Sequence, residues 1–428
     1  MKPISEVTCC IVDSGLFVPM ALRMAEACKR VIFWSPDQRG FPSIREGMIG
    51  NGFYNVERVL DFWGMLGEID LFCFPDIGHA GLQQHLVSMG KAVWGSRHGD
   101  RLELSREHLM AVLNDLDLEV PTFQVVIGLR ELASVLSDKE DCYVKISRWR
   151  GDMETTHWRN WKMDSGWIDW LAVNLGPYAN HMRFLVFDKI DTKLEIGADT
   201  YSVVGQWPGL MLNGIEGKDK SYFAAVTKFA DMPEPLVEIM TAVGPLLKDY
   251  GYRNQISFEV RVKSDKFWWI DATQRGGMPS TASQHLLWKN FPEIVWHGAH
   301  GELVEPEPDA MFSIETMITC KSDTQTWDVV EIPKELEPYA RFSNCAYVDG
   351  CYVFPPDELH TGDLGWLCCT SDTPRGALEK QKELADMLPD GLSADIESMA
   401  DVIKEIEEAQ SQGIPVTDKT MPEPAEVL

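Results

Sequence analysis

The first hundred residues alternate short apolar runs with helical segments, and this alternation restricts the fold more than any other feature. The runs at 7–12, 31–34, 69–74 and 92–94 are mainly apolar, and each ends at or near a Gly, Pro or Asp residue. Short runs of this kind indicate strands that are buried on both faces. Because helices separate them, they predict a parallel sheet covered by helices. Residues 1–97 are therefore predicted to form a Rossmann-like domain.

The rest of the chain divides by a change of pattern. A length of 428 residues predicts two or three domains. Between residues 98 and 309 strands and helices do not alternate regularly, which favours an α+β arrangement with antiparallel sheet. Residues 310–413 begin with mixed strands and end with two helices, so a C-terminal α+β region is predicted there. Residues 414–428 are rich in Pro and charge, and we expect a flexible tail.

The charge of the chain limits its partners. The formal net charge is −27, from 39 Lys and Arg against 66 Asp and Glu. A field of this sign repels nucleic-acid phosphates and anionic membranes, so neither is an expected partner. An anionic nucleotide would need a local basic pocket or a divalent metal. The dinucleotide fingerprint G-x-G-x-x-G is absent from the sequence.

The cysteines and the apolar segments bear on the location of the protein. None of the ten cysteines belongs to a C-x-x-C motif, so spacing does not support a zinc site. Many lie in apolar runs, which predicts buried free thiols in a reducing cytosol. The sequence contains neither an apolar signal-peptide segment at its N-terminus nor an apolar run of 18 residues. We therefore expect a cytoplasmic protein.

A predicted β-hairpin carries the most informative polar residues. The strands at 256–262 and 267–272 are joined by a predicted four-residue link, and they carry Glu259 and Asp271, twelve positions apart. Residues two apart in a strand share a face, so Asp271, Thr273 and Arg275 point the same way. Two carboxylates and a hydroxyl are hard oxygen ligands that suit Mg²⁺. The alternative is a surface hairpin whose polar face is simply solvated.

This hairpin resembles the metal-binding hairpin of the ATP-grasp superfamily, in particular its glycinamide ribonucleotide synthetase and biotin carboxylase branch. There an acid is followed, about twelve residues later, by E-x-N-x-R. Asp271 occupies the position of the second Glu, Thr273 that of the Asn, and Arg275 that of the Arg. The resemblance implies Mg²⁺, or Mn²⁺ in its place, on Glu259, Asp271 and Thr273. It also implies a catalytic role for Arg275.

Two cations upstream resemble the phosphate-binding lysines of the same superfamily. Arg106 precedes Val120-Pro121-Thr122, as the first lysine does in the family, and Lys145 lies 39 residues further on (145 − 106) in an apolar strand. The resemblance implies that both bind the ATP phosphates. For Lys145 the alternative is a lysine on an edge strand that prevents strand pairing.

Three further segments complete the resemblance. Arg148 and Gly151 lie in the segment 148–156, which corresponds to a mobile Gly-rich loop over the phosphates; an exposed basic loop is the alternative. Asp188, Ile190 and Glu195 correspond to the hinge that binds adenine and ribose, although strand alternation also predicts solvated polar residues there. Lys218 and Lys220 correspond to phosphate-contacting cations, with an exposed loop as the alternative. The ATP-binding residues implied in this way are Arg106, Lys145, Arg148, Gly151, Asp188, Ile190, Glu195, Lys218 and Lys220.

The fold implied by the resemblance is an α/β and α+β chain: an ATP-grasp domain at 98–309, preceded by the Rossmann-like domain and followed by an α+β cap. The implied activity is that of a carboxylate–amine ligase that uses ATP and an acyl phosphate to join small-molecule substrates. Dimers are frequent in such families, so a homodimer is compatible with it. Two alternatives stay open: a carboxylase of the biotin-dependent type, and a catalytically inactive relative that serves in binding or assembly.

Overall fold

The computed structural model describes residues 1–35, 48–148, 155–192, 194–217, 220–320, 327–355, 362–417 and 419–427. In these ranges none of the helices is both long enough and apolar enough to cross a membrane. All ten cysteines fall inside the ranges; all are free thiols, and all but Cys320 and Cys351 are buried.

The N-terminal sheet is parallel, as predicted. It consists of β1 (Thr8–Val12), β2 (Arg30–Trp34), β3 (Val56–Arg58), β4 (Leu71–Cys73) and β5 (Ala92–Trp94), in the order β3-β2-β1-β4-β5. Helices α1 (Val18–Ala25) and α3 (Ala80–Ser88) connect its strands. Sequence analysis did not identify β3, because Val-Glu-Arg lacks the apolar character of the other strands. All carboxyl ends meet at one edge, where such sheets place ligands.

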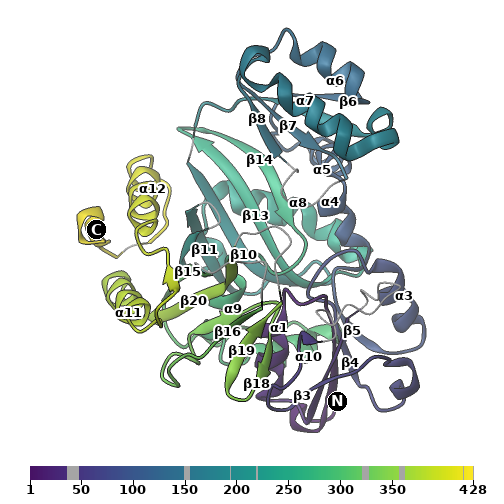
Figure 1. Ribbon diagram of the computed structural model, residues 1–428, viewed down its shortest axis with the longest axis vertical. Helices are drawn as coiled ribbons and strands as arrows, with labels where there is room; N and C mark the ends of the chain where they lie inside the picture. Colours follow the sequence, from purple (N-terminus) through teal and green to yellow (C-terminus); the bar gives the residue numbers. More distant parts are fainter. Residues whose placement is uncertain are drawn as a thin grey trace.

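A small lobe stands apart at one end of the molecule (Figure 1). It is the antiparallel sheet β6-β9-β7-β8 with the two helices that cover it. Its elements are β6 (Phe123–Ile127), α6 (Leu129–Leu136), β7 (Cys142–Ile146), β8 (Thr155–Trp158), α7 (Trp161–Leu175) and β9 (Arg183–Asp188). Along β7, Cys142, Val144 and Ile146 are buried in the core beneath these helices. Strand alternation therefore turns Lys145 to the opposite face.

A nine-stranded sheet forms the body of the protein. Its order is β14-β13-β10-β11-β12-β15-β20-β17, and β21 pairs with β15. The strands are β10 (Glu195–Val203), β11 (Leu210–Gly217), β12 (Ser221–Lys228), β13 (Arg253–Lys263), β14 (Lys266–Thr273), β15 (Phe312–Cys320), β17 (Ala340–Phe342), β20 (Asp363–Ser371) and β21 (Leu392–Ala394). Because β12 pairs with β15, the expected boundary between residues 309 and 310 falls within one continuous sheet.

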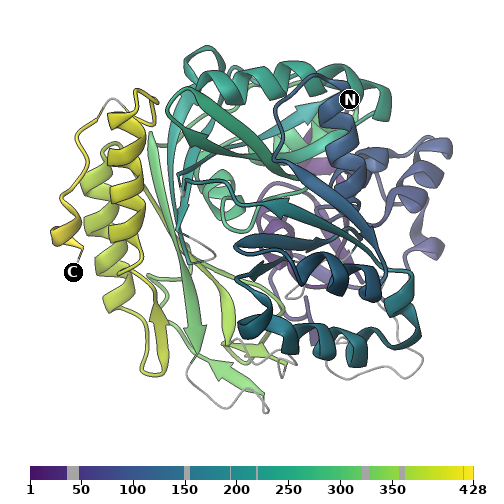
Figure 2. The same cartoon turned by 90° about the horizontal axis from the view of Figure 1, so that it is seen from above.

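Helices and a small sheet surround this body. Helices α11 (Pro374–Asp386) and α12 (Met399–Ser411) lie side by side along one flank (Figure 2). The remaining α-helices of the described ranges are α4 (Arg101–Leu104), α5 (Arg106–Asp115), α8 (Glu234–Tyr250), α9 (Thr281–Leu287) and α10 (Phe291–Ala299). The strands β16 (Asp328–Val330), β19 (Cys351–Phe354) and β18 (Ala346–Val348) form a separate three-stranded sheet.

The hairpin of β13 and β14 is present, but its link is shorter than predicted. Lys263 pairs with Lys266, which leaves a two-residue turn of Ser264 and Asp265 instead of four linking residues. Ser264 has φ of 56°, as the tight hairpin turns require. The prediction was wrong because strand pairing uses backbone groups, so charged side chains do not end a strand.

The last residues of the chain carry part of the core. In the segment 414–428, expected to be a flexible tail, Val416 is 2% exposed and Val427 is 5% exposed. Glu426 also forms an ion pair with Arg375 at the start of α11. The segment follows α12, whose apolar face packs against β11 and β12.

Replacing Ile406 with Ala tests this packing. The side chain is fully buried in α12, so its loss should lower the free energy of unfolding by about 3 kcal/mol through lost burial and a cavity. Urea unfolding measures the change. Glu407→Ala, at an exposed position of the same helix, should change it by less than about 0.5 kcal/mol. Equal stability of the two variants would contradict the packing of α12.

Candidate active site

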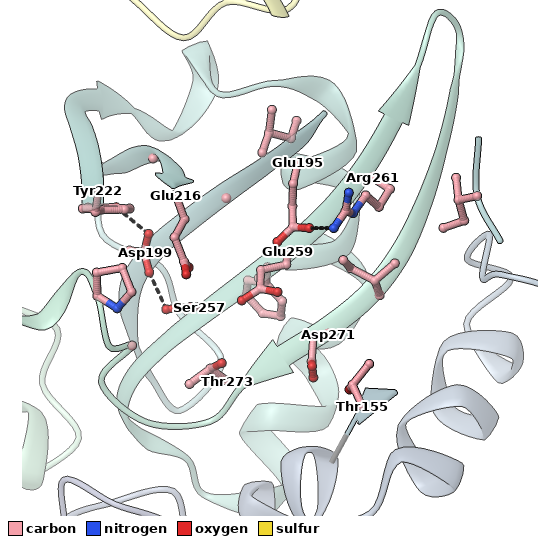
Figure 3. Close-up of a pocket in the computed structure, with 18 of the residues that line it drawn as sticks. Thr155, Glu195, Asp199, Glu216, Tyr222, Ser257, Glu259, Arg261, Asp271 and Thr273 are labelled. Atoms are coloured by element: carbon pink, nitrogen blue, oxygen red, sulfur yellow. Dashed lines mark hydrogen bonds and ion pairs between the residues drawn. The ribbon is translucent and has the colours of Figure 1, made fainter. Parts of the chain in front are cut away.

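A cavity of about 470 Å³ lies between the small lobe and the body. The small lobe contributes Lys145 from β7 and Asp188 from β9, and β10 to β14 and α12 contribute much of the remaining wall. Figure 3 shows Glu195, Glu259 and Asp271 in this wall. Acidic side chains outnumber cationic ones in this wall. The described acidic residues that line it are Asp188, Glu195, Asp199, Glu216, Glu259, Asp271 and Glu405, and the cationic ones are Lys145, Arg261 and Arg275.

A β-bulge sets the orientation of Asp271. Glu259 is the register partner of Asp271, yet the next residue, Val260, pairs with Trp269, so that Ile270 is an extra residue in β14. Trp269 is 1% exposed and belongs to the core, whereas Asp271 lines the cavity. Directly opposed residues of an antiparallel pair share a face. The bulge therefore brings both carboxylates to the cavity, where Figure 3 shows them on neighbouring strands.

Asp271 forms contacts with both predicted phosphate-binding cations. Its Oδ2 accepts a hydrogen bond from Arg106 Nη1 at 2.8 Å, and Lys145 Nζ lies 3.8 Å from the same oxygen. Burial, and then the positive charge of Arg106, lower the pKa of Lys145 to about 8, although Asp271 and Glu259 oppose this. β7 is an internal strand of its sheet, so the edge-strand alternative for Lys145 does not apply.

Glu259 sits in a strongly negative environment. Burial raises its pKa well above the ordinary value, and the charges of Glu195, Asp271 and Glu216 raise it further. In the described part of the chain no hydrogen bond or ion pair to its carboxylate is formed. A bound cation would remove this repulsion, because an opposite charge at close range favours the ionised carboxylate.

The arrangement suits Mg²⁺. Within the described ranges no group of three or more His, Cys, Asp or Glu side chains is arranged to hold a metal by itself. Mg²⁺ commonly takes only one or two carboxylates and completes its octahedron with water and substrate phosphates. Glu259 and Asp271 are such a pair, and Thr273 lines the same cavity as a neutral oxygen donor.

The side chain of Arg275 is positioned by two carboxylates, those of Glu103 and Asp76. Its Nε donates to Glu103 Oε1 at 3.0 Å and lies 3.5 Å from Asp76 Oδ1. Glu103 is buried and also accepts a hydrogen bond from the backbone N–H of Gln274 at 2.7 Å. Arg275 Nη1 is buried and has no hydrogen-bond partner in the described part of the chain. Sequence analysis missed Glu103, which lies 172 positions from Arg275 along the chain.

Several acidic residues of the wall were not assigned by sequence analysis. Asp199 accepts hydrogen bonds from Ser257 and from the Tyr222 hydroxyl, the latter at 2.5 Å, and burial raises its pKa (Figure 3). The sequence does contain a signal for Asp199. Glu195 and Asp199 are four positions apart, so the two-residue period of a strand places them on one face. Glu405 had no such signal: only folding brings α12 to the cavity, where burial and Glu195 raise its pKa to about 7.

The predicted site residues fall into three groups. The first group lines the cavity and comprises Lys145, Asp188, Ile190, Glu195, Glu259, Asp271, Thr273 and Arg275. Arg106 does not line the cavity but donates a hydrogen bond to Asp271, which does. Within this group, Glu195 pairs with Arg261 at 2.6 Å and Asp188 with Lys139 at 2.7 Å.

The structure places two predicted residues elsewhere. Arg148 lines a different cavity, and Lys220 is exposed and pairs with Asp395 at 3.2 Å. Gly151 and Lys218 lie outside the described residues.

Solved structures resemble the whole chain. A phosphoribosylamine–glycine ligase from Thermotoga maritima is 16% identical, with a TM-score of 0.66 over 91% of this chain and 99% of that one. The biotin carboxylase domain of a 2-oxoglutarate carboxylase from Hydrogenobacter thermophilus, solved with MgADP, ADP and bicarbonate, is 10% identical, with a TM-score of 0.67 over 96% and 99%. An L-amino acid ligase from Bacillus licheniformis is 13% identical, with a TM-score of 0.59 over 91% and 98%.

This chain has the ATP-grasp fold. The structural neighbours include two proteins named as ligases. The fold that the sequence resemblance implied is thereby confirmed. Neither the protein-family models nor the curated proteins gave a match to the sequence.

Lys145 should titrate well below an ordinary lysine. We expect a pKa of about 8 in the native protein. Asp271→Asn should lower it further, because the variant removes a negative charge that favours the ammonium form. NMR titration of ¹³C-labelled lysine measures both values, and Lys145→Gln assigns the signal. The control is Asp231→Asn, since Asp231 is exposed and is not among the charges that act on Lys145. Titration of Lys145 near 10.5 would contradict its burial.

Proposed function

We propose that the protein is an ATP- and Mg²⁺-dependent ligase that joins a small-molecule carboxylate to an amine through an acyl phosphate. The observation that carries the proposal is the pair Glu259 and Asp271, which face one cavity with Lys145 of the small lobe 3.8 Å from Asp271. Two carboxylates and a lysine on opposite walls suit a Mg²⁺–triphosphate, whose metal needs oxygen ligands and whose phosphates need cations.

Each part of the nucleotide has matching residues along the cavity. Lys145 and Arg106 would bind phosphate oxygens, and in doing so exchange their contacts with Asp271 for contacts with the nucleotide. Asp188 and Ile190, which line the cavity at the end of the small lobe, would contact ribose and base. When bound to Glu259 and Asp271, Mg²⁺ would neutralise charge on the phosphates.

The reaction proceeds in two displacements. An oxygen of the substrate carboxylate attacks the γ-phosphorus, and the bond from that phosphorus to its bridging oxygen breaks, so that ADP leaves with the electron pair. The amine nitrogen then attacks the carbonyl carbon of the acyl phosphate; inorganic phosphate leaves, and the amine loses a proton. Arg275 would hold the carboxylate or the transferred phosphoryl group through its free Nη1, because Glu103 already fixes Nε.

The excess of acid in the cavity makes nucleotide binding depend on metal. The described lining carries seven carboxylates and three cationic side chains, so the anionic triphosphate alone is repelled. Removal of divalent metal with EDTA should therefore weaken nucleotide binding strongly.

Hydroxylamine trapping tests the complete reaction. With ATP, Mg²⁺ and a panel of amino acids and short carboxylic acids, we expect hydroxamate and ADP in equal amounts, because hydroxylamine intercepts an acyl phosphate. Glu259→Gln/Asp271→Asn should reduce the rate by at least about a hundredfold through loss of the metal ligands. Glu397→Gln/Asp401→Asn removes the same charge from exposed positions and should retain the rate.

Three outcomes would contradict the proposal. Nucleotide binding without turnover on any member of the panel would favour an inactive binding protein. Turnover that requires bicarbonate and biotin would favour a carboxylase. Equal rates in wild type and Glu259→Gln/Asp271→Asn would remove the metal site from the mechanism.

A further inference from the structure

A second cavity of about 670 Å³ lies where the small lobe meets α4 and α5. Its lining is basic, in contrast to the chain as a whole, which has a net charge of −27. Three arginines contribute to it: Arg101 is the first residue of α4, Arg148 follows β7, and Arg183 is the first residue of β9. The two cavities have no lining residue in common among the described residues.

Two of these three guanidinium groups form neither a hydrogen bond nor an ion pair within the part of the chain that the structure describes. Arg183 forms a two-pronged ion pair with Glu107, with both N–O distances at 2.6 Å. The side chains of Arg101 and Arg148 are exposed and form no ion pair or hydrogen bond with any residue in the described ranges, although the charge of Arg148 helps to lower the pKa of Glu107. In a strongly acidic chain, arginines are expected to find carboxylates. Two that stay unpaired beside the same cavity indicate a site for an anion from solution.

The charge of the lining matches a phosphate monoester. Three arginines and Glu107 give a net charge of about +2, and a phosphate monoester carries about −1.5 to −2 at neutral pH. His108 also lines the cavity and contributes little charge, because burial lowers its pKa below the ordinary value. A carboxylate, with a single charge, would leave the lining under-neutralised. Guanidinium groups also bind phosphate through two parallel hydrogen bonds.

The second cavity and the proposed nucleotide cavity lie on different sides of α5. Ser105, which caps α5, and His108 in its first turn are three apart and line this cavity together, whereas the side chain of Arg106 points to another side of the helix and contacts Asp271. At this point α5 is also joined to the small lobe, since the Arg106 N–H donates to Ser147 O at 3.0 Å. An anion held here would therefore contact both the small lobe and α4.

We propose that Arg101, Arg148 and Arg183 form a binding site for a phosphate group, separate from the nucleotide cavity. The ligand is a phosphomonoester or free phosphate. Arg148 and Arg183 would hold it from the small lobe and Arg101 from α4, so that occupancy ties the small lobe to the rest of the chain. This inference does not depend on the proposed ligase activity.

Isothermal titration of the full chain with inorganic phosphate, without nucleotide or metal, tests the site. We expect saturable binding that Arg101→Gln/Arg148→Gln weakens by about tenfold or more, because two charge-assisted contacts are lost. Both residues are exposed, so the variant should fold; the single variant Arg148→Gln gives a second measurement. A parallel titration with glycerol 3-phosphate distinguishes a phosphomonoester site from one for free phosphate, and acetate gives the response to a carboxylate.

Two further variants separate this site from its alternatives. Arg130→Gln/Lys162→Gln removes the same charge from exposed positions of the small lobe that form no ion pair in the described structure, and should leave phosphate affinity within about twofold. Lys145→Gln, in the nucleotide cavity, should also retain it. Loss of phosphate binding in Lys145→Gln but not in Arg101→Gln/Arg148→Gln would assign the phosphate to the nucleotide cavity and overturn the proposal. Equal losses in the two double variants, or no saturable binding in wild type, would also overturn it.

Discussion

The orientation of Asp271 depends on a single extra residue in β14. Lys263 pairs with Lys266 beside the turn, and a regular ladder from that pair would set Glu259 opposite Ile270 and Asp271 opposite Phe258. Phe258 is 1% exposed, so a carboxylate beside it would be buried in the core without a partner. The bulge at Ile270 reverses this arrangement and brings Asp271 to the cavity beside Glu259. The proposed metal site therefore depends on this irregularity of the hairpin.

The two carboxylates, Glu259 and Asp271, differ in their charged neighbours. Asp271 is neutralised by Arg106 and Lys145, whereas Glu259 faces other carboxylates and has a raised pKa. Arg106 and Lys145 thus lie against Asp271, whereas Glu259 has no ion-pair partner in the described part of the chain. A Mg²⁺–nucleotide would fit this arrangement, because the metal would offset the charge of Glu259 and the phosphates would bind Arg106 and Lys145. On this account metal and nucleotide bind together, and each needs the other.

Sequence reasoning predicted the elements whose signal is local. The parallel N-terminal sheet, the hairpin and the position of Lys145 in an apolar strand followed from periodicity, and the order of motifs led to the ATP-grasp fold. Which side chains share a face of the hairpin was harder to predict from the sequence. The twelve-residue spacing of Glu259 and Asp271 places them on one face only when the bulge is known. Glu103 and Glu405 were missed because tertiary contacts alone bring α4 and α12 to the site. Arg148 was assigned to the nucleotide by motif order, and the structure gives it a different cavity.

A crystal structure with MgADP tests the central claim most directly. We expect a metal ion with carboxylate oxygens of both Glu259 and Asp271 at about 2.1 Å, and with phosphate oxygens completing its coordination. Lys145 should then contact a phosphate and no longer Asp271. A nucleotide bound in this cavity with its metal touching neither carboxylate would contradict the account.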